Sequence, residues 1–353
     1  MSTPKLKIVT VVGARPQFVK AAVLRKRCEE FGVHEVLVHT GQHYDHAMSD
    51  VFFAELGMRA ADYKLDLEHR SHAGMTGEIM SGVERILLTE KPDCCVVYGD
   101  TNSTLAAALA ASKLHIPVCH IEAGLRSFNK KMPEEINRIL TDHVSDLLFC
   151  STRGSVDQLA AESITQGVHH VGDIMFDAVK MFSKTQSKSS FCIAHGLDPN
   201  KPIAAVTLHR AETVGKAARF AQVLDATRDV GQGYQLAFPI HPNTRKKSDE
   251  FDLSLEGFTL LEPMPYLAMQ SLLAHCDLVI TDSGGVQKEA YFHATRCVTM
   301  RDETEWVETI ENGWNRLWTQ SEYACAPRPI EDYGTGQSVA QILQIMLETH
   351  AAR

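Results

Sequence analysis

The chain has 353 residues, a length that favours two domains over one hydrophobic core, and its 44% hydrophobic and 22% charged residues are ordinary for a globular protein. The formal net charge of -9 and the lack of a long basic run argue against nucleic acid or an anionic membrane surface as the main partner. The sequence has neither an N-terminal signal-peptide pattern nor an apolar run of the roughly 20 residues that a membrane span needs.

The nine cysteines bear on the cellular location. Most of them lie inside apolar runs and no CxxC pair occurs, so the sequence predicts buried thiols in a reducing compartment rather than a disulfide framework. We therefore expect a cytoplasmic protein.

Short apolar segments alternate with longer helical patterns along the chain. Near-continuous apolar strands separated by helices are typical of parallel sheets covered on both faces. Two such series predict an α/β fold with two doubly wound, Rossmann-like domains. The expected strands are 7–12, 35–39, 94–98, 118–121, 147–150 and 169–171 in the first series and 203–208, 235–239, 259–261, 278–281 and 296–300 in the second, with helical patterns at 17–31, 101–114 and 134–144.

The boundary between the domains is expected near the segment 183–190, SKTQSKSS, which is the most linker-like part of the chain. We assign 1–172 to the first domain and 173–335 to the second. No GxGxxG follows a strand, no GxxxxGK[ST] occurs, and the 17 histidines show no HExxH spacing. The sequence therefore predicts neither a dinucleotide cofactor, nor a P-loop, nor a metal site.

Two cations follow the first strand. In open α/β sheets, ligands bind outside the carboxyl ends of the strands, and the cleft between two such domains is the expected site. In GARPQFVK, Arg15 and Lys20 lie at or near a helix start that Pro16 favours. Cations beside free helix N–H groups indicate a phosphate or carboxylate ligand. The alternative is that Lys20 is solvated and Arg15 caps a neighbouring helix.

Carboxylates follow other elements of the first domain. Asp100 and Glu122 each come directly after a strand, and Glu134 and Glu135 occupy the first turn of the helix that Pro133 opens. Compensation of the helix dipole is the alternative for Asp100 and for one member of the adjacent pair. Carboxylates crowded in a cleft shift one another's pKa and can serve as acid and base.

The second domain contributes groups suited to an anion. His209 and His241 each follow a strand, and Arg301 lies just beyond the last strong strand. The stretch LVITDSGGVQKEA predicts a strand, a tight turn at 282–285 and a helix start, where free backbone N–H groups and the helix dipole suit a phosphate. The alternative is an ordinary βα turn with Ser283 as N-cap. Together, the two domains predict an enzyme that acts by proton transfer on an anionic, nucleotide-linked substrate.

Eight segments resemble one family, in order and over nearly the whole chain. They are GARPQFVK, TGQHYD, VYGDTNST, HIEAGLRS, MPEEINR, TLHRAE, HPN and TDSGGVQKEA, and together they resemble the non-hydrolysing UDP-N-acetylglucosamine 2-epimerases. The resemblance implies two Rossmann-like domains in the arrangement of GT-B glycosyltransferases, with the active site in the interdomain cleft. It also implies that a C-terminal helix at about 336–353 packs back on the first domain.

The resemblance further implies a reaction and its residues. C2 of a UDP-linked N-acetylhexosamine is inverted without NAD or another cofactor, by anti elimination of UDP to a 2-acetamidoglucal and re-addition on the other face. The product would serve the synthesis of cell-surface polysaccharide precursors, and family members are usually homodimers. The implied catalytic residues are Asp100, Glu122, Glu134 and His209; the implied UDP ligands are Arg15, Lys20, Ser283, Gly284, Gly285, Glu289 and Arg301; further substrate or regulatory contacts are Gln42, His43, Arg138 and His241.

Two features leave the substrate and its regulation open. Members activated by UDP-N-acetylglucosamine often carry Gln-His-Arg after the second strand, whereas this chain has Tyr44 in place of the arginine. The segment 301–315 also resembles UDP-2,3-diacetamido-2,3-dideoxyglucuronate 2-epimerases, whose substrates carry a C6 carboxylate that Lys130, Lys131 or Arg153 would pair with. We rank UDP-N-acetylglucosamine first as the commoner substrate.

Other activities fit the same fold. A GT-B glycosyltransferase would need an acceptor and would leave the C2 proton in place. A hydrolysing epimerase would release UDP and free N-acetylmannosamine. A UDP-sugar-binding regulator would have no turnover, and the three carboxylate motifs argue against it.

Overall fold

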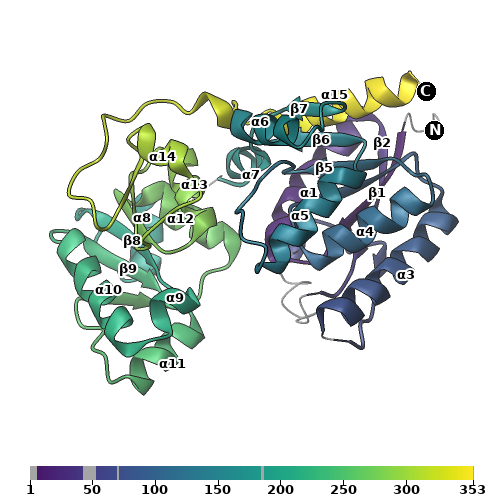
Figure 1. Ribbon diagram of the computed structural model, residues 1–353. Helices are drawn as coiled ribbons and strands as arrows, with labels where there is room; N and C mark the ends of the chain where they lie inside the picture. The colour runs from purple at the N-terminus through teal and green to yellow at the C-terminus, as the bar shows by residue number, and fades with distance from the viewer. Residues whose placement is uncertain (1–5, 43–52, 70, 184–186, 353) are drawn as a thin grey trace. The chain divides into compact units, whose positions relative to one another are not determined.

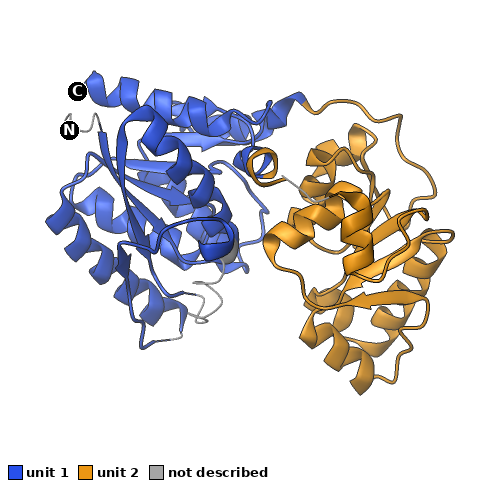
Figure 2. Ribbon diagram, turned by 180° about the vertical axis from the view of Figure 1, so that it is seen from behind, with its two compact units in different colours: residues 1–178, 331–353 blue, residues 179–330 orange. Residues whose placement is uncertain are grey.

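The computed structural model describes residues 6–42, 53–69, 71–183 and 187–352. The chain divides into two compact units, Met1–Ala178 with Glu331–Arg353, and Val179–Ile330 (Figure 2). The units therefore change at 178 and 330, whereas the sequence placed the changes at 172 and 335. Each unit contains one sheet, and every recorded strand pair in both sheets is parallel. The predicted fold class, two Rossmann-like α/β domains, is confirmed.

Unit 1 has a seven-stranded sheet in the order β3-β2-β1-β4-β5-β6-β7 (Figure 1). The order reverses between β1 and β4, which makes the carboxyl ends of these two strands the switch point of the sheet. The elements are β1 (Leu6–Val12), α1 (Arg15–Phe31), β2 (Val33–His39), β3 (Tyr63–Lys64), α3 (His72–Glu90), β4 (Cys94–Tyr98), α4 (Asn102–Lys113), β5 (Val118–Ile121), α5 (Pro133–Val144), β6 (Leu147–Cys150), α6 (Arg153–Ala161), β7 (Val168–His170), α7 (Ile174–Phe182), η1 (Glu331–Tyr333) and α15 (Ser338–Ala351).

The central strands of unit 1 are mostly apolar because both faces of the sheet are covered; Lys7 and Thr10 of β1 and His120 of β5 are exceptions. Val9 and Val11 of β1 pack into one core with Ile79 and Val83 of α3 and with the alanines of α4. Those alanines allow α4 to approach the sheet closely, because each side chain is only a methyl group. Elsewhere in unit 1, the C-terminal helix α15 packs against α1.

A buried carboxylate fixes the return of the chain to unit 1. Asp177 of α7 accepts hydrogen bonds of 3.0 Å each from the backbone N–H groups of Ser338 and Val339 at the start of α15. These are two of the N–H groups that a helix start leaves without an intrahelical partner. Asp177, near the end of the first of the two chain segments that form unit 1, thus caps α15, which belongs to the second segment.

Unit 2 has a six-stranded sheet in the order β10-β9-β8-β11-β12-β13. Its order reverses between β8 and β11, so the segments that follow these two strands are the second switch point. The elements are α8 (Lys188–Ala194), β8 (Ile203–Thr207), α9 (Ala211–Val214), α10 (Ala217–Val230), β9 (Gln235–Pro239), α11 (Pro242–Glu250), β10 (Phe258–Leu261), α12 (Tyr266–His275), β11 (Leu278–Thr281), α13 (Gly284–Phe292), β12 (Cys297–Thr299), α14 (Val307–Glu311) and β13 (Asn315–Leu317).

The segment predicted as a linker is partly helical. Its last residues belong to α8, and the side chain of Ser187 caps that helix by accepting from the backbone N–H of Ser190 at 3.2 Å. Some of the serines that suggested a linker therefore form the N-cap and the first turn of α8. Among the described residues, no helix is both long enough and apolar enough to cross a membrane.

Candidate active site

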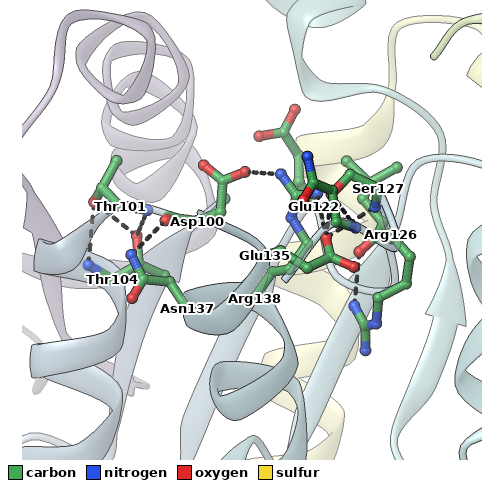
Figure 3. Close-up of polar contacts among 12 residues, drawn as sticks. Asp100, Thr101, Thr104, Glu122, Arg126, Ser127, Glu135, Asn137 and Arg138 are labelled. Carbon is green, nitrogen blue, oxygen red and sulfur yellow. Dashed lines mark hydrogen bonds and ion pairs between the residues drawn. The ribbon is translucent and has the colours of Figure 1, made fainter. Parts of the chain in front are cut away.

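The turn after β4 places Asp100 at the switch point of unit 1. Gly99 adopts φ +59, a left-handed conformation that favours glycine, and its N–H donates to the carbonyl of Ile121 at 2.9 Å. The side chain of Asp100 pairs with Arg138 of α5, and its carbonyl accepts from Asn137 Nδ2 at 2.9 Å (Figure 3). Residues of α5 thus hold Asp100 by both its side chain and its backbone.

Glu122 follows the neighbouring strand β5 in an unusual conformation. Its φ of +68 is left-handed, which is uncommon for a residue with a side chain and is often found at functional sites. Its carboxylate pairs with Lys20 Nζ of α1, and both side chains are largely buried. Lys20 was predicted to bind the diphosphate; in this structure it holds Glu122, and its role toward a substrate stays a prediction.

The adjacent Glu134 and Glu135 at the start of α5 differ in environment. Glu135 is buried and accepts from the backbone N–H and Oγ of Ser127 at 2.8 and 2.9 Å and from the N–H of Phe128 at 2.8 Å. Burial opposes ionisation of Glu135, but these hydrogen bonds and Arg138 Nη1, at 2.9 Å, bring its pKa below the ordinary value. Glu135 thus stabilises the preceding loop, whereas Glu134 is exposed.

The other predicted contacts of unit 1 are partly outside the described residues, which include neither His43 nor the side chain of Arg15. The side-chain oxygen of Gln42 accepts from the N–H and Oγ of Ser103 at 2.9 and 2.6 Å. Gln42 therefore caps the first turn of α4. This gives it a structural role, and its predicted contact with a substrate or regulator stays a prediction.

In unit 2, a buried carboxylate organises the switch point. Asp282 follows β11, and its Oδ2 accepts from the backbone N–H groups of His209 and Arg210, which follow β8, at 2.9 Å each. Nδ1 of His209 lies 3.2 Å from Oδ1 of Asp282. Burial opposes ionisation, but the His209 ring and the two N–H groups bring the pKa of Asp282 below its ordinary value. The His209 side chain remains 47% exposed, so its ring is accessible to a ligand.

The glycine turn begins α13. Ser283 is the N-cap of α13, and its Oγ accepts from the N–H of Val286 at 3.5 Å. The sequence had predicted this cap as the alternative to phosphate binding. A Cβ on Gly284 would collide with Oε1 of Glu305 and lie 3.5 Å from Arg210 Nη2. Among the described residues, nothing lies within 4 Å of a Cβ built on Gly285. Gly284 therefore lets the Glu305 carboxylate lie against the helix start, and Gly285 leaves the helix start open to an approaching group.

Two arginines face the carboxylate beside this turn. Arg301 Nη1 lies 2.7 Å from Oε2 of Glu305, and Arg210 also lowers the pKa of Glu305 by its charge. Burial works in the opposite direction on this carboxylate and is the largest effect, yet the net pKa is below the ordinary value. Sequence reasoning missed Glu305 because it lies in a loop beyond the last strong strand, where an acidic residue usually signifies only solvent exposure.

The remaining predicted residues of unit 2 lie on helices at the same sheet edge. Glu289 is partly buried on α13. His241 is the N-cap of α11, and its Nδ1 accepts from the N–H of Asn243 at 3.2 Å. Asp282 was predicted only as the first residue of the tight turn, and its hydrogen bonds to the backbone after β8 were not predicted. In the described part of the chain, no group of three His, Cys, Asp or Glu side chains is placed to hold a metal ion.

Taken separately, each unit offers one chemical capability. Unit 1 presents carboxylates held by cations on the turns that follow β4 and β5, which is suited to moving protons. Unit 2 presents a helix N-terminus, two arginines and a histidine at its own switch point, which is suited to binding a phosphate.

Known proteins resemble this chain over most of its length. A family model described as UDP-N-acetylglucosamine 2-epimerase matches residues 26–347. The UDP-2,3-diacetamido-2,3-dideoxy-D-glucuronate 2-epimerase of Pseudomonas aeruginosa is 44% identical over 97% of this chain and 99% of the relative. A UDP-N-acetylglucosamine 2-epimerase homolog of Methanococcus maripaludis is 45% identical over 88% of each chain. The crystal structure of Methanocaldococcus jannaschii UDP-GlcNAc 2-epimerase in complex with UDP-GlcNAc and UDP has a TM-score of 0.83 and 35% identity, covering 97% of this chain and all of that one.

Proposed function

This chain belongs to the UDP-N-acetylglucosamine 2-epimerase family, and we propose that it inverts C2 of a UDP-linked 2-acetamido sugar, with UDP-N-acetylglucosamine as the first candidate substrate. The observation that carries the proposal is the pair of carboxylates, Asp100 and Glu122, on the turns that follow the adjacent strands β4 and β5 of unit 1. An enzyme that must remove a proton and return it on the other face needs such groups. A protein that merely binds UDP does not.

The proposed reaction is an elimination followed by an addition. A carboxylate removes the C2 proton, the C1–O bond to UDP breaks, and the electron pair forms a C1=C2 double bond. UDP then adds back to C1 while a proton returns to C2 from the opposite face. Atoms and electrons balance without an oxidant or reductant.

The roles of the residues follow from this sequence of steps. The C2–H is not next to a carbonyl and is only weakly acidic, so stabilisation of the departing diphosphate must lower much of the barrier. We assign that work to the turn at Ser283, Gly284 and Gly285 with Arg301 and His209 of unit 2. Proton removal and return fall to Asp100, Glu122 and Glu134, and Glu289 is the proposed ligand of the ribose hydroxyls.

A second candidate substrate is UDP-2,3-diacetamido-2,3-dideoxyglucuronate. It is supported by the Pseudomonas aeruginosa relative of that name, which aligns with this chain over almost all of its length. The same C2 chemistry applies, because the added C6 carboxylate and C3 acetamido group lie outside the bonds that change.

Proton NMR in D2O tests the proposal. With UDP-N-acetylglucosamine, we expect deuterium to enter C2 while the UDP-linked manno epimer appears. Exchange with the diacetamido-uronate alone would select the second substrate. Free N-acetylmannosamine with UDP would identify a hydrolysing enzyme. A folded sample that binds UDP but exchanges C2 of neither sugar would refute the proposal and favour a glycosyltransferase or a binding protein.

We also propose a cytoplasmic homodimer. The location is supported by the nine cysteines, which are all free thiols, eight of them buried. The assembly rests on the family resemblance, and sedimentation analysis of the purified chain decides it.

A further inference from the structure

We propose that His120 is a positioning residue of this reaction, held as a buried imidazolium that fixes the turns carrying Asp100 and Glu122. His120 lies on β5, two residues before Glu122, and its side chain has no exposure to solvent. Nδ1 lies 2.7 Å from Oδ1 of Asp142, and Nε2 lies 2.7 Å from the carbonyl oxygen of Gly99. The proposed effect of His120 on catalysis rests on the proposed function, whereas the charge of its ring does not.

The charge of the ring follows from its two partners. A carbonyl oxygen only accepts, so Nε2 must donate a proton to Gly99. Asp142 is ionised, because it also accepts from Arg126 Nη1 at 2.6 Å and from the N–H of Gly124 at 3.1 Å. Nδ1 must therefore donate to Asp142 as well. A ring that donates from both nitrogens carries two protons and one positive charge.

The surrounding charges balance this buried cation. Asp142 of α5 lies between His120 and Arg126, and Arg126 makes a bidentate pair with Glu162 at 2.8 and 2.7 Å. Burial opposes ionisation of Asp142, but His120 and Arg126 together bring its pKa below the ordinary value. The four groups alternate in sign and sum to zero, which offsets the penalty of burying each charge.

The pair of His120 and Asp142 connects the two carboxylate turns. The ring holds the carbonyl of Gly99, immediately before Asp100, and Asp142 holds the N–H of Gly124, two residues after Glu122. The turns are close, since a Cβ on Gly99 would lie 3.5 Å from Oε2 of Glu122. Loss of the ring's second donor would release Gly99 and let the Asp100 carboxylate move, without touching a substrate-binding group of unit 2.

The charge state is tested directly in the full chain labelled with 15N-histidine. We expect the His120 ring, assigned by its loss in His120→Gln, to show a proton on both nitrogens at neutral pH. A single protonated nitrogen would overturn the proposed charge. This count needs no turnover, so it stands or falls independently of the proposed epimerisation.

The positioning role is tested by kinetics of His120→Asn and His120→Gln, each of which supplies a neutral amide in place of the two-donor ring. We expect kcat per folded molecule to fall by roughly 10²-fold, as a misplacement of reacting groups by about 1 Å can cause, with little change in KM. His169→Gln is the control, because His169 lies on β7 in the same unit and packs against Phe149. It is expected to keep kcat. An unchanged kcat in both His120 variants, or a loss confined to KM, would refute the positioning role.

Discussion

Replacement of Glu35 by glutamine is expected to change how the stability of unit 1 depends on pH. Glu35 lies on β2 with 4% of its surface exposed, and Arg25 Nε is 3.5 Å from its Oε2. Burial is the largest effect and raises the pKa of Glu35 to about 7, although Thr10 and Arg25 act in the opposite direction. The folded chain therefore holds a proton that the unfolded chain, with a carboxyl pKa near 4.5, has already released.

The magnitude follows from this difference. About 2.5 pKa units at about 1.36 kcal/mol each give about 3 kcal/mol. Because the folded pKa is the higher one, the wild type has the full contribution below pH about 4.5 and loses it as the pH rises through about 7. Glutamine has no proton to lose. The free energy of unfolding of Glu35→Gln should therefore rise relative to wild type by about 3 kcal/mol over that window.

Urea unfolding at a series of pH values measures this difference. All three tryptophans, Trp306, Trp314 and Trp318, lie in unit 2, so their fluorescence follows that unit while circular dichroism follows both. The control is Glu29→Gln on the exposed face of α1, where we expect a difference within about 0.5 kcal/mol at every pH. A difference between wild type and Glu35→Gln that is equally small and constant with pH would refute the reasoning.

Three further predictions concern the proposed site. Asp100→Asn should lower kcat by about 10²- to 10⁴-fold, as loss of an acid–base group does, while calorimetry finds nearly unchanged UDP affinity; equal losses in both would mean that Asp100 is structural. Arg301→Ala should raise the Kd for UDP by about tenfold or more, since a hydrogen bond to a charged group contributes about 1.5–3 kcal/mol, and an unchanged Kd would remove its phosphate role. Gly284→Ala should weaken UDP binding more than Gly285→Ala does, because its Cβ would displace the Glu305 carboxylate that Arg301 pairs with; equal Kd values for UDP in the two variants would contradict this arrangement.

The fold was predictable because most strand residues are apolar on both faces of the sheets. Runs such as 94–98 and 278–281 stand out from the helices around them, and the parallel order follows from the alternation. The strands β3 and β13 were missed, since two or three residues are too few to show a pattern and each lies at a sheet edge. Their place in the sheet depends on pairing with β2 and β12, which local sequence does not encode.

The sequence predicted at which edge of the sheet the candidate site residues lie, but not which side chains pair with one another. Residues after strands must lie at one sheet edge, so Asp100 and Glu122 could be placed from the sequence. The pair of Lys20 and Glu122 joins residues 102 positions apart, and only the packing of α1 against the sheet decides it. The burial of Glu135 rather than Glu134 likewise depends on how α5 is rotated relative to the loop at Ser127.

At both switch points, a buried ion holds the backbone beside the groups that we propose meet the substrate. In unit 2, the Asp282 carboxylate accepts the N–H groups of His209 and Arg210, and in unit 1 the His120 ring donates to the carbonyl of Gly99. Each ion has the sign that its backbone partners require. A reaction that depends on the placement of carboxylates and a leaving group gains most from such preorganised support, because the reacting side chains then need not hold themselves in position. The substitutions that test the mechanism best are therefore those of the buried ions, which should change kcat without contacting the sugar.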